Sequence, residues 1–439
     1  MLFGWHDRDR HTRCRSQPLS SGGATRFAVG GRRRKLKSSE KTMAAQAETV
    51  AVPNIEELFQ PTHDERARQS MVSMLRKHAI IDLRAELKRD YEGRVEPALR
   101  ERGEVPRNWR EIEQAMESQA SYRFYSTLRY HAQEMCYLSV QPAVERALPQ
   151  MISLAKDLAV RNPSGGSLRL DPNFEIPRYL AALDVHLAPG WVTTEHTIDD
   201  VAQGAVVGFG GKVFTGQHPY RKRAGVVAES IAHWLKATRP GFAPRRLLDM
   251  ATTAGKNLFP YKTAFPNAEA HGIDCGAPVL RYGHALAEHE GVAVHFSQQN
   301  AEHTDFPDSH FDLIVSSFFL HEIPVKATRN VLRECYRLLA PGGVMVHMEL
   351  PDEASVSDYD NFFWNWDTIN NNEPFYTSFR AQEPIALCAE AGFERDKCFK
   401  LTIPDAASFG EERYAKFLRG EIPAPAHGSG GWFVMGAQK

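Results

Sequence analysis

Residues 247–255 read LLDMATTAG, and this stretch decides the fold class of the chain. Two leucines, an aspartate and then small residues are typical of a buried strand that turns sharply into a helix and leaves backbone free to meet a ligand. The acid is Asp249, and the turn after it contains Ala251, Thr252 and Gly255. Such turns usually carry several glycines, whereas this one keeps a single glycine.

Strands and helices alternate after this turn. Further strands are predicted at 268–274, 292–299, 311–320 and 342–350, with helices between them. This alternation predicts a parallel sheet wound on both faces, because each crossover must place a helix on the sheet. A helix at 384–393, an antiparallel-type strand at 395–403 and a closing strand at 431–439 end the chain. We therefore predict a doubly wound, Rossmann-like α/β sheet of seven strands.

The 439-residue length favours two or three domains. Residues 1–42 are basic, poor in acids and expected to be a disordered tail, with organelle targeting or nucleic-acid contact as alternatives. Residues 43–165 have helical periodicity and predict a mainly helical domain. Residues 166–240 predict a mixed connecting lobe, and 241–439 form the α/β domain.

Two short strands are expected in the connecting lobe, at Trp191–Thr194 and Val206–Phe214, the second interrupted by a turn or bulge at Gly210–Gly211. An amphipathic helix is predicted at 220–240, closed by Pro240 and Gly241.

Composition excludes several classes of function. The formal net charge is −1, no concentrated basic surface is expected, and no run reaches the roughly 18 apolar residues of a membrane span. The six cysteines are scattered without a C-x-x-C pair, which predicts reduced thiols and no metal site. We expect a cytoplasmic protein with no nucleic-acid partner, or an organelle protein if residues 1–42 act in targeting.

Four motifs in order carry a family resemblance: LLDMATTAG, HGIDCG (271–276), QNAEHTDFPDSHFDLIVSSFFLHEI (299–323) and RECYRLLAPGGVMVHME (333–349). On these motifs, residues 245–439 resemble a class I S-adenosylmethionine-dependent methyltransferase domain, in the group that includes ubiquinone and menaquinone biosynthetic methyltransferases. The resemblance covers less than half of the chain. It implies S-adenosylmethionine as cofactor.

The resemblance also implies cofactor-binding residues. Asp274, at the end of the second motif, is expected to accept the ribose hydroxyls, with a helix N-cap as its structural alternative. Asp249, with Ala251, Thr252 and Gly255, is expected to hold the methionine part or its own turn. The remaining residues predicted to contact the cofactor are Asn300 and Ala301, where the family places an acid and a small residue near the adenine, and Ser317.

Other cofactors fit the turn poorly. A dinucleotide needs G-x-G-x-x-G, but Ala251, Thr253 and Lys256 occupy those places. A nucleotide P-loop needs a glycine where Met250 stands and a hydroxyl where Asn257 stands. S-adenosylmethionine carries no phosphate and does not require these features.

Methyl transfer is a direct displacement, so a base is needed only for a hydroxyl or carbon-acid acceptor. His321 is the first candidate, followed by Glu322, with His347 and Glu349 as further ones; helix capping or loop support is the structural alternative. The insert at 351–379 is rich in aromatic residues and is expected to form a lid over the acceptor, or else to pack against the N-terminal helices.

We therefore predict methyl transfer to a carbon or oxygen of a small aromatic or lipophilic acceptor. The N-terminal helices are expected to shape the pocket or form a homodimer. The alternative is a methyltransferase-like binding or assembly protein without activity, because Ala251, Thr253 and Asn300 depart from the family pattern. An oxidoreductase that binds NAD(P)H is a third possibility.

Overall fold

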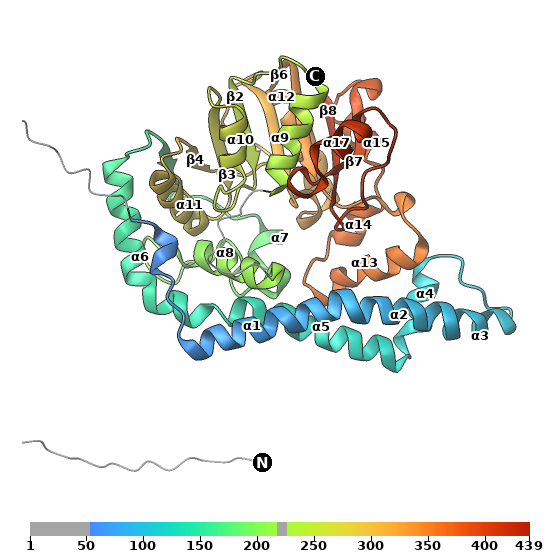
Figure 1. Cartoon of the computed structure of the whole chain (residues 1–439). Helices are drawn as coiled ribbons and strands as arrows, with labels where there is room; N and C mark the ends of the chain where they lie inside the picture. Colours follow the sequence, from blue (N-terminus) through green and yellow to red (C-terminus); the bar gives the residue numbers. More distant parts are fainter. Residues whose placement is uncertain (1–52, 217–225) are drawn as a thin grey trace, which may run out of the picture. The chain divides into compact units, whose positions relative to one another are not determined.

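The computed structural model describes residues 53–216 and 226–439 (Figure 1). The predicted basic tail at 1–42 lies outside the described residues, as do the first residues of the helix predicted at 220–240. That helix is described from Val226 onward, as α9 (Val226–Thr238). Among the described residues, no helix combines the length and the apolar character needed to cross a bilayer.

The described part contains one sheet of eight strands in the order β1-β4-β3-β2-β5-β6-β8-β7. Seven strands run in the same direction, and β8 alone is reversed, so that it is antiparallel to both of its neighbours, β6 and β7. The strands are β1 (Ser167–Arg169), β2 (Arg246–Met250), β3 (Glu269–Asp274), β4 (His295–Gln298), β5 (Phe311–Ser317), β6 (Leu339–Met348), β7 (Cys398–Pro404) and β8 (Gly431–Gln438). The doubly wound sheet with its final inserted strand is confirmed. The predicted count of seven omitted β1, a three-residue edge strand within the presumed connecting lobe.

Helices cover both faces of the sheet (Figure 1). Leu247 and Leu248 on β2 point to opposite faces because successive side chains of a strand alternate. Leu247 joins the core under α9, α10 (Leu258–Ala264) and α11 (Ala277–Glu290). Leu248 joins the core under α12 (Val325–Leu338) and α15 (Pro384–Glu390). The chain order reverses between β2 and β5, so the strand ends leave a crevice at that point.

The N-terminal part is helical, as predicted, and its first long helix begins with a capping box. Thr62 accepts from the backbone of Glu65, whose carboxylate accepts from the backbone of Thr62. The helices are α1 (His63–Lys77), α2 (Arg84–Asp90), α3 (Glu96–Glu101), α4 (Trp109–Glu117), α5 (Ala120–Leu138) and α6 (Gln141–Arg161), with π-helical turns joining α1 to α2 and α2 to α3. Shorter helices elsewhere are α7 (Arg178–Ala181), α16 (Ala406–Phe409) and α17 (Glu411–Leu418).

The strand predicted at Val206–Phe214 is wrong, because these residues belong to helix α8 (Ala202–Thr215). The glycines there serve close packing rather than a turn. A Cβ on Gly204 would lie 2.3 Å from Tyr282 on α11, and one on Gly210 would lie 2.4 Å from Tyr137 on α5. A helix squeezed between two others therefore needs residues without side chains at these positions. The strand predicted at Trp191–Thr194 is also wrong, since this segment forms turns.

The aromatic insert is helical, with α13 (Asp358–Asn370) and α14 (Tyr376–Arg380). Phe362, Phe363 and Trp366 share a buried cluster with residues of α4 and α5. The indole N–H of Trp366 donates to Ser126 Oγ at 2.9 Å. The insert thus packs against the N-terminal helices, and its role as a cover for the acceptor stays a prediction.

Candidate functional site

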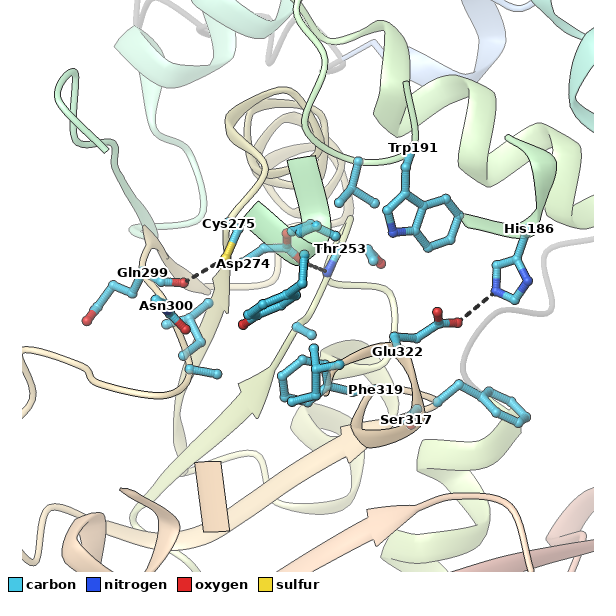
Figure 2. Close-up of a pocket in the computed structure, with 18 residues that line it drawn as sticks. His186, Trp191, Thr253, Asp274, Cys275, Gln299, Asn300, Ser317, Phe319 and Glu322 are labelled. Atoms are coloured by element: carbon cyan, nitrogen blue, oxygen red, sulfur yellow. Dashed lines mark hydrogen bonds and ion pairs between the residues drawn. The ribbon is translucent and has the colours of Figure 1, made fainter. Parts of the chain in front are cut away.

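A cavity opens at the carboxyl ends of β2, β3 and β5 (Figure 2), the place where doubly wound sheets bind ligands. About 890 Å³ of space lies between its walls, part of it open to solvent. The loops after these strands form one wall, and the segment between α7 and α8 forms the other. The lining residues are Tyr179, Leu180, His186, Trp191, Val192, Ala251, Thr253, Ile273, Asp274, Cys275, Gln299, Asn300, Ala301, Ser317, Phe318, Phe319, Glu322 and Ile323.

In the loop after β2, every second residue from 251 to 255 has a positive φ. Ala251, Thr253 and Gly255 have φ values of +56°, +49° and +69°. This left-handed conformation favours glycine, so the loop keeps the backbone of a glycine-rich turn with other residues at two of the three positions. Gly255 also has a steric reason to stay, because a Cβ there would lie 2.5 Å from the ring of Phe296. Ala251 lines the cavity, but Gly255 is not among the lining residues.

Asp274, at the end of β3, faces the cavity and holds the loop after β2. Its Oδ2 accepts the backbone N–H of Thr253 and its Oδ1 accepts that of Gly276, both at 2.9 Å. Burial raises the pKa of this carboxyl to about 6, although the backbone N–H donors oppose the shift. The bond to Gly276, which precedes α11, means that Asp274 also supports that helix start.

Asp249 lies beneath the loop rather than in the cavity wall. Its Oδ2 accepts from the hydroxyl of Thr252 at 2.7 Å, and both side chains are buried. Burial raises the pKa of Asp249 to about 7. These two predicted residues therefore build the loop, while Thr253, not predicted as a contact, lines the cavity.

The remaining residues predicted to contact the cofactor belong to the cavity wall. Asn300, Ala301 and Ser317 all line the cavity. The amide oxygen of Asn300 accepts the backbone N–H of Glu302 at 2.9 Å, so this side chain is fixed within its own turn. Its contact with an adenine remains a prediction.

Of the two predicted catalytic residues, Glu322 reaches the cavity and His321 lies behind it. His321 Nδ1 is 2.6 Å from Glu349 Oε2, and its Nε2 is 3.5 Å from Glu322 Oε1. Burial opposes protonation of His321, but the charge of Glu349 outweighs it and raises the His321 pKa to about 10. Glu349 also accepts two backbone N–H groups of the 319–320 turn. The remaining candidate, His347, is fully buried beside Ser316 and is not among the lining residues.

Two further residues near the cavity were not predicted from the sequence. His186 lies opposite Glu322, with Nε2 3.1 Å from its Oε1 (Figure 2). Glu373, just after α13, lies 2.9 Å from His186 Nδ1. Burial opposes the shift, yet the charges of Glu373 and Glu322 raise the His186 pKa well above its ordinary value. For Glu322, burial alone would raise the pKa. The nearby His186 and His321 outweigh this effect and lower the Glu322 pKa to about 2.

The cavity fits the cofactor that the motifs imply. Each oxygen of Asp274 receives one backbone N–H, and a carboxylate oxygen can accept a second hydrogen bond from a ribose hydroxyl. None of the described lining residues is lysine or arginine, which suits a cofactor without phosphate. Lys256, next to the loop, is instead paired with Glu56 at 2.5 Å.

Comparisons with known proteins agree with this geometry. A family model described as a methyltransferase domain matches residues 247–343. Demethylmenaquinone methyltransferase of Thermus thermophilus is 37% identical over 109 residues, which cover 25% of this chain and 49% of that protein. This chain thus spans about half the length of that relative.

Ubiquinone/menaquinone biosynthesis C-methyltransferase UbiE of Ectopseudomonas mendocina is 30% identical over 187 residues, which cover 38% of this chain and 71% of that protein. Among solved structures, an O-methyltransferase family protein of Burkholderia thailandensis matches with 12% identity over 55% of this chain and 60% of that one. Its TM-score of 0.38 is too low to establish a shared fold. On the sequence relationship, the chain belongs to the class I S-adenosylmethionine-dependent methyltransferases, and its cofactor is S-adenosylmethionine.

Proposed function

We propose that this protein transfers a methyl group from S-adenosylmethionine to a carbon or oxygen of a small aromatic acceptor. The observation that carries the proposal is one cavity lined by two largely buried carboxylates, those of Asp274 and Glu322, together with apolar and aromatic side chains. One carboxylate suits a ribose diol, and the other suits a hydroxyl of the acceptor. The walls suit a flat apolar ring.

On the cofactor side, the bound sulfonium supplies an electrophilic methyl group. The protein contributes alignment and the exclusion of water. Asp274 fixes the ribose, while the loop at 251–255 offers backbone close to the methionine part. Because Asp274 also holds the N–H of Thr253, cofactor position and loop conformation depend on the same carboxylate.

On the acceptor side, Trp191, Phe318 and Phe319 provide aromatic surface. Glu322 is ionised at neutral pH, because His186 and His321 hold its pKa low against the effect of burial. It accepts the hydroxyl proton of the acceptor in a hydrogen bond and orients the ring toward the donor. His321 acts through Glu322 and is a positioning residue.

The names of the relatives support a ring-shaped acceptor. They are a demethylmenaquinone methyltransferase and a ubiquinone/menaquinone C-methyltransferase. The reduced quinones of these names are aromatic rings with hydroxyl groups, which match both the apolar walls and Glu322. We therefore place hydroquinones first among the acceptors to test.

Calorimetric titration with S-adenosylhomocysteine tests the cofactor side. We expect micromolar affinity for the wild type and a loss of at least about tenfold for Asp274→Ala, since one carboxylate holds two hydroxyls. Asp308→Ala is the matched control, because Asp308 is exposed and paired with Arg337 outside the cavity. Absence of binding by the folded wild type would refute the cofactor site and favour a binding protein without activity.

Turnover tests the acceptor side. Radiolabelled S-adenosylmethionine is incubated with 1,4-naphthohydroquinone, catechol or an aliphatic amine, and label in the organic extract is counted. We expect label in the aromatic hydroxyl compounds and at least about tenfold less with Glu322→Gln, because positioned proton acceptors contribute roughly that much or more. Transfer to the amine alone would contradict the proposed acceptor class.

We also propose that the protein forms a homodimer through its N-terminal helices. Met71, Met74 and Ile81 recur at helical spacing on α1 and the turn after it, and they are 47%, 66% and 53% exposed. Replacing all three with glutamine should convert a dimer to a monomer in analytical ultracentrifugation. A monomeric wild type at all concentrations tested would exclude the dimer.

A further inference from the structure

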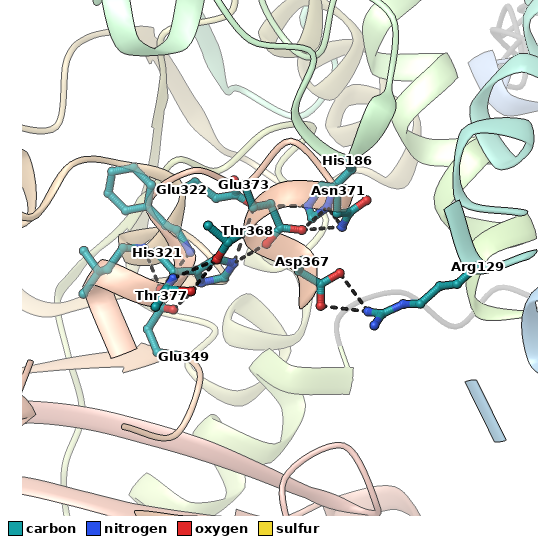
Figure 3. A network of polar contacts seen from close by, with 12 residues as sticks. Arg129, His186, His321, Glu322, Glu349, Asp367, Thr368, Asn371, Glu373 and Thr377 are labelled. Carbon is teal, nitrogen blue, oxygen red and sulfur yellow. Dashed lines mark hydrogen bonds and ion pairs between the residues drawn. The ribbon is translucent and has the colours of Figure 1, made fainter. Parts of the chain in front are cut away.

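Five ionisable side chains form one cluster next to the acceptor side of the cavity (Figure 3). Three are carboxylates and two are imidazoles: Glu322, Glu349, Glu373, His186 and His321. They come from four places in the sequence, namely the turn before α8, the turn after β5, the end of β6 and the end of α13. Only packing of the insert and of the 185–192 segment against the sheet brings them together.

Three of these side chains have the geometry of a common ligand set. One ligand atom each from His186, Glu322 and Glu373 lies within 4.8 Å of the other two. Three ligand atoms at about 2.0–2.2 Å from one ion are at most about 3.8 Å apart when they are evenly spaced around it. His186 Nε2 already lies 3.1 Å from Glu322 Oε1, so modest side-chain movements would bring all three residues to one ion.

Buried acceptor atoms that lack a well-formed hydrogen bond point independently to a cation. The Glu322 side chain is only 10% exposed, and both of its carboxylate oxygens are buried. Neither oxygen makes a hydrogen bond to the described protein atoms. Its Oε1 is near His186 and His321, but neither contact has hydrogen-bond geometry. The amide oxygen of Asn371, whose Nδ2 lies 3.2 Å from His186 Nδ1, is likewise buried and unpaired within the described part. All of these atoms are acceptors, and a buried acceptor without a hydrogen bond is destabilising unless a cation or a donor satisfies it.

We propose that His186, Glu322 and Glu373 bind a divalent metal ion beside the acceptor cavity. A divalent ion satisfies the unpaired oxygens of Glu322. An ion there would also bring positive charge next to three carboxylates, those of Glu322, Glu349 and Glu373.

The donor set narrows the choice of ion. One imidazole with two carboxylates suits Mn²⁺ or Zn²⁺, whereas Ca²⁺ and Mg²⁺ take oxygen ligands almost exclusively.

The site gives the acceptor a second point of attachment. Glu322 and His186 both line the cavity, so an ion held between them is accessible to an acceptor oxygen. This consequence rests on the proposed methyl transfer and specifies an acceptor with an oxygen able to bind a metal, such as one of two adjacent hydroxyls. The metal site itself does not depend on the reaction.

The test uses the full chain without an affinity tag, treated with EDTA and dialysed. MnCl₂ and ZnCl₂ are titrated by calorimetry, and the spectrum of bound Mn²⁺ is followed by electron paramagnetic resonance. The variants are Glu322→Gln and Glu373→Gln, which keep side-chain size. Glu269→Gln is the matched control, because Glu269 also pairs with a histidine, His271, at 3.0 Å but lies on β3 outside the cluster. S-adenosylhomocysteine affinity and circular dichroism are measured on each protein.

We expect one equivalent bound by the wild type and by Glu269→Gln, and at least about tenfold weaker binding by both cluster variants. Glu373→Gln should keep its affinity for S-adenosylhomocysteine, which shows that the variant is folded. No metal binding by the wild type, or equal binding by all four proteins, overturns the proposal. Cluster-dependent metal binding without S-adenosylhomocysteine binding would refute the proposed function alone, and the reverse result would refute the metal site alone.

Discussion

In the loop after β2, substitutions at two positions with left-handed backbone should change the stability of the protein in opposite directions. Ala251 has a φ of +56°, and the left-handed conformation costs about 1–2 kcal/mol for an L residue. Ala251→Gly removes this cost, but glycine loses about 0.4–1 kcal/mol more conformational entropy on folding. The net expectation is that Ala251→Gly stabilises the protein by about 0.5–1 kcal/mol.

Gly255→Ala should have the opposite sign and a larger size. The new Cβ would meet two ring atoms of Phe296, at 2.5 and 2.6 Å, and overpacking of this kind costs about 1–3 kcal/mol beyond the backbone strain. Gly291→Ala supplies the control, because Gly291 has a similar φ of +66° with nothing within 4 Å of its Cβ position. We expect Gly291→Ala to cost about 0.5–1 kcal/mol and Gly255→Ala about 2–4 kcal/mol.

Urea unfolding of the three variants, followed by tryptophan fluorescence, measures these differences. Ala251→Gly should also retain its affinity for S-adenosylhomocysteine within about twofold, since only a methyl group leaves the cavity wall and the loop keeps its backbone. The reasoning fails if Ala251→Gly destabilises the protein by more than about 0.5 kcal/mol, or if Gly255→Ala costs no more than Gly291→Ala.

Two further predictions concern buried charges. Because burial raises the pKa of Asp274 to about 6 and its ionised form accepts the ribose hydroxyls, S-adenosylhomocysteine affinity should fall as pH drops below about 6, approaching tenfold per unit. Calorimetry between about pH 8 and pH 5 checks this, and a sloping profile for Asp274→Asn would contradict it. Asp367 accepts two hydrogen bonds from Arg129, so Asp367→Asn should cost about 3–5 kcal/mol in urea unfolding. The apolar double variant Arg129→Met with Asp367→Leu should recover most of that loss, and equal destabilisation of the two proteins would argue against a buried-charge penalty.

Several residues of the cavity wall were predictable from sequence because they follow strand ends. Buried strands are recognisable as apolar runs, and parallel strands bring their carboxyl ends to one edge. Asp274 and Ser317 were found in this way, and both line the cavity. For Asp249 the strand pattern left two roles open, and the structure shows a contact within its own turn. Its carboxylate bonds inward to Thr252, a detail of loop conformation that strand pattern does not carry.

The strand prediction failed where glycines are required by close packing between helices. In α8 they read as breaks in a strand, yet Gly204 and Gly210 allow α11 and α5 to approach closely. A single sequence does not show which neighbour a glycine accommodates. His186 and Glu373 were missed for a related reason. Each lies in a short segment without periodicity, and they meet only through contacts between residues far apart in the chain.

The segment before α8 concentrates backbone strain beside the acceptor cavity. His186, Leu187 and Trp191 have φ values of +58°, +58° and +40°, and such residues cost roughly 1–3 kcal/mol each. The segment is held by outside contacts, since Gln133 Nε2 donates to His186 O and Gln203 Nε2 to Pro189 O.

Helices α5 and α8, which supply these glutamines, therefore fix the aim of His186 and Trp191 into the cavity. The residues proposed to bind the cofactor come instead from the ends of β2 and β3. We therefore predict that the helical part and the insert mainly determine which acceptor is methylated. Exchange of residues 185–192 should change the acceptor that is methylated. The affinity for S-adenosylhomocysteine should stay largely the same.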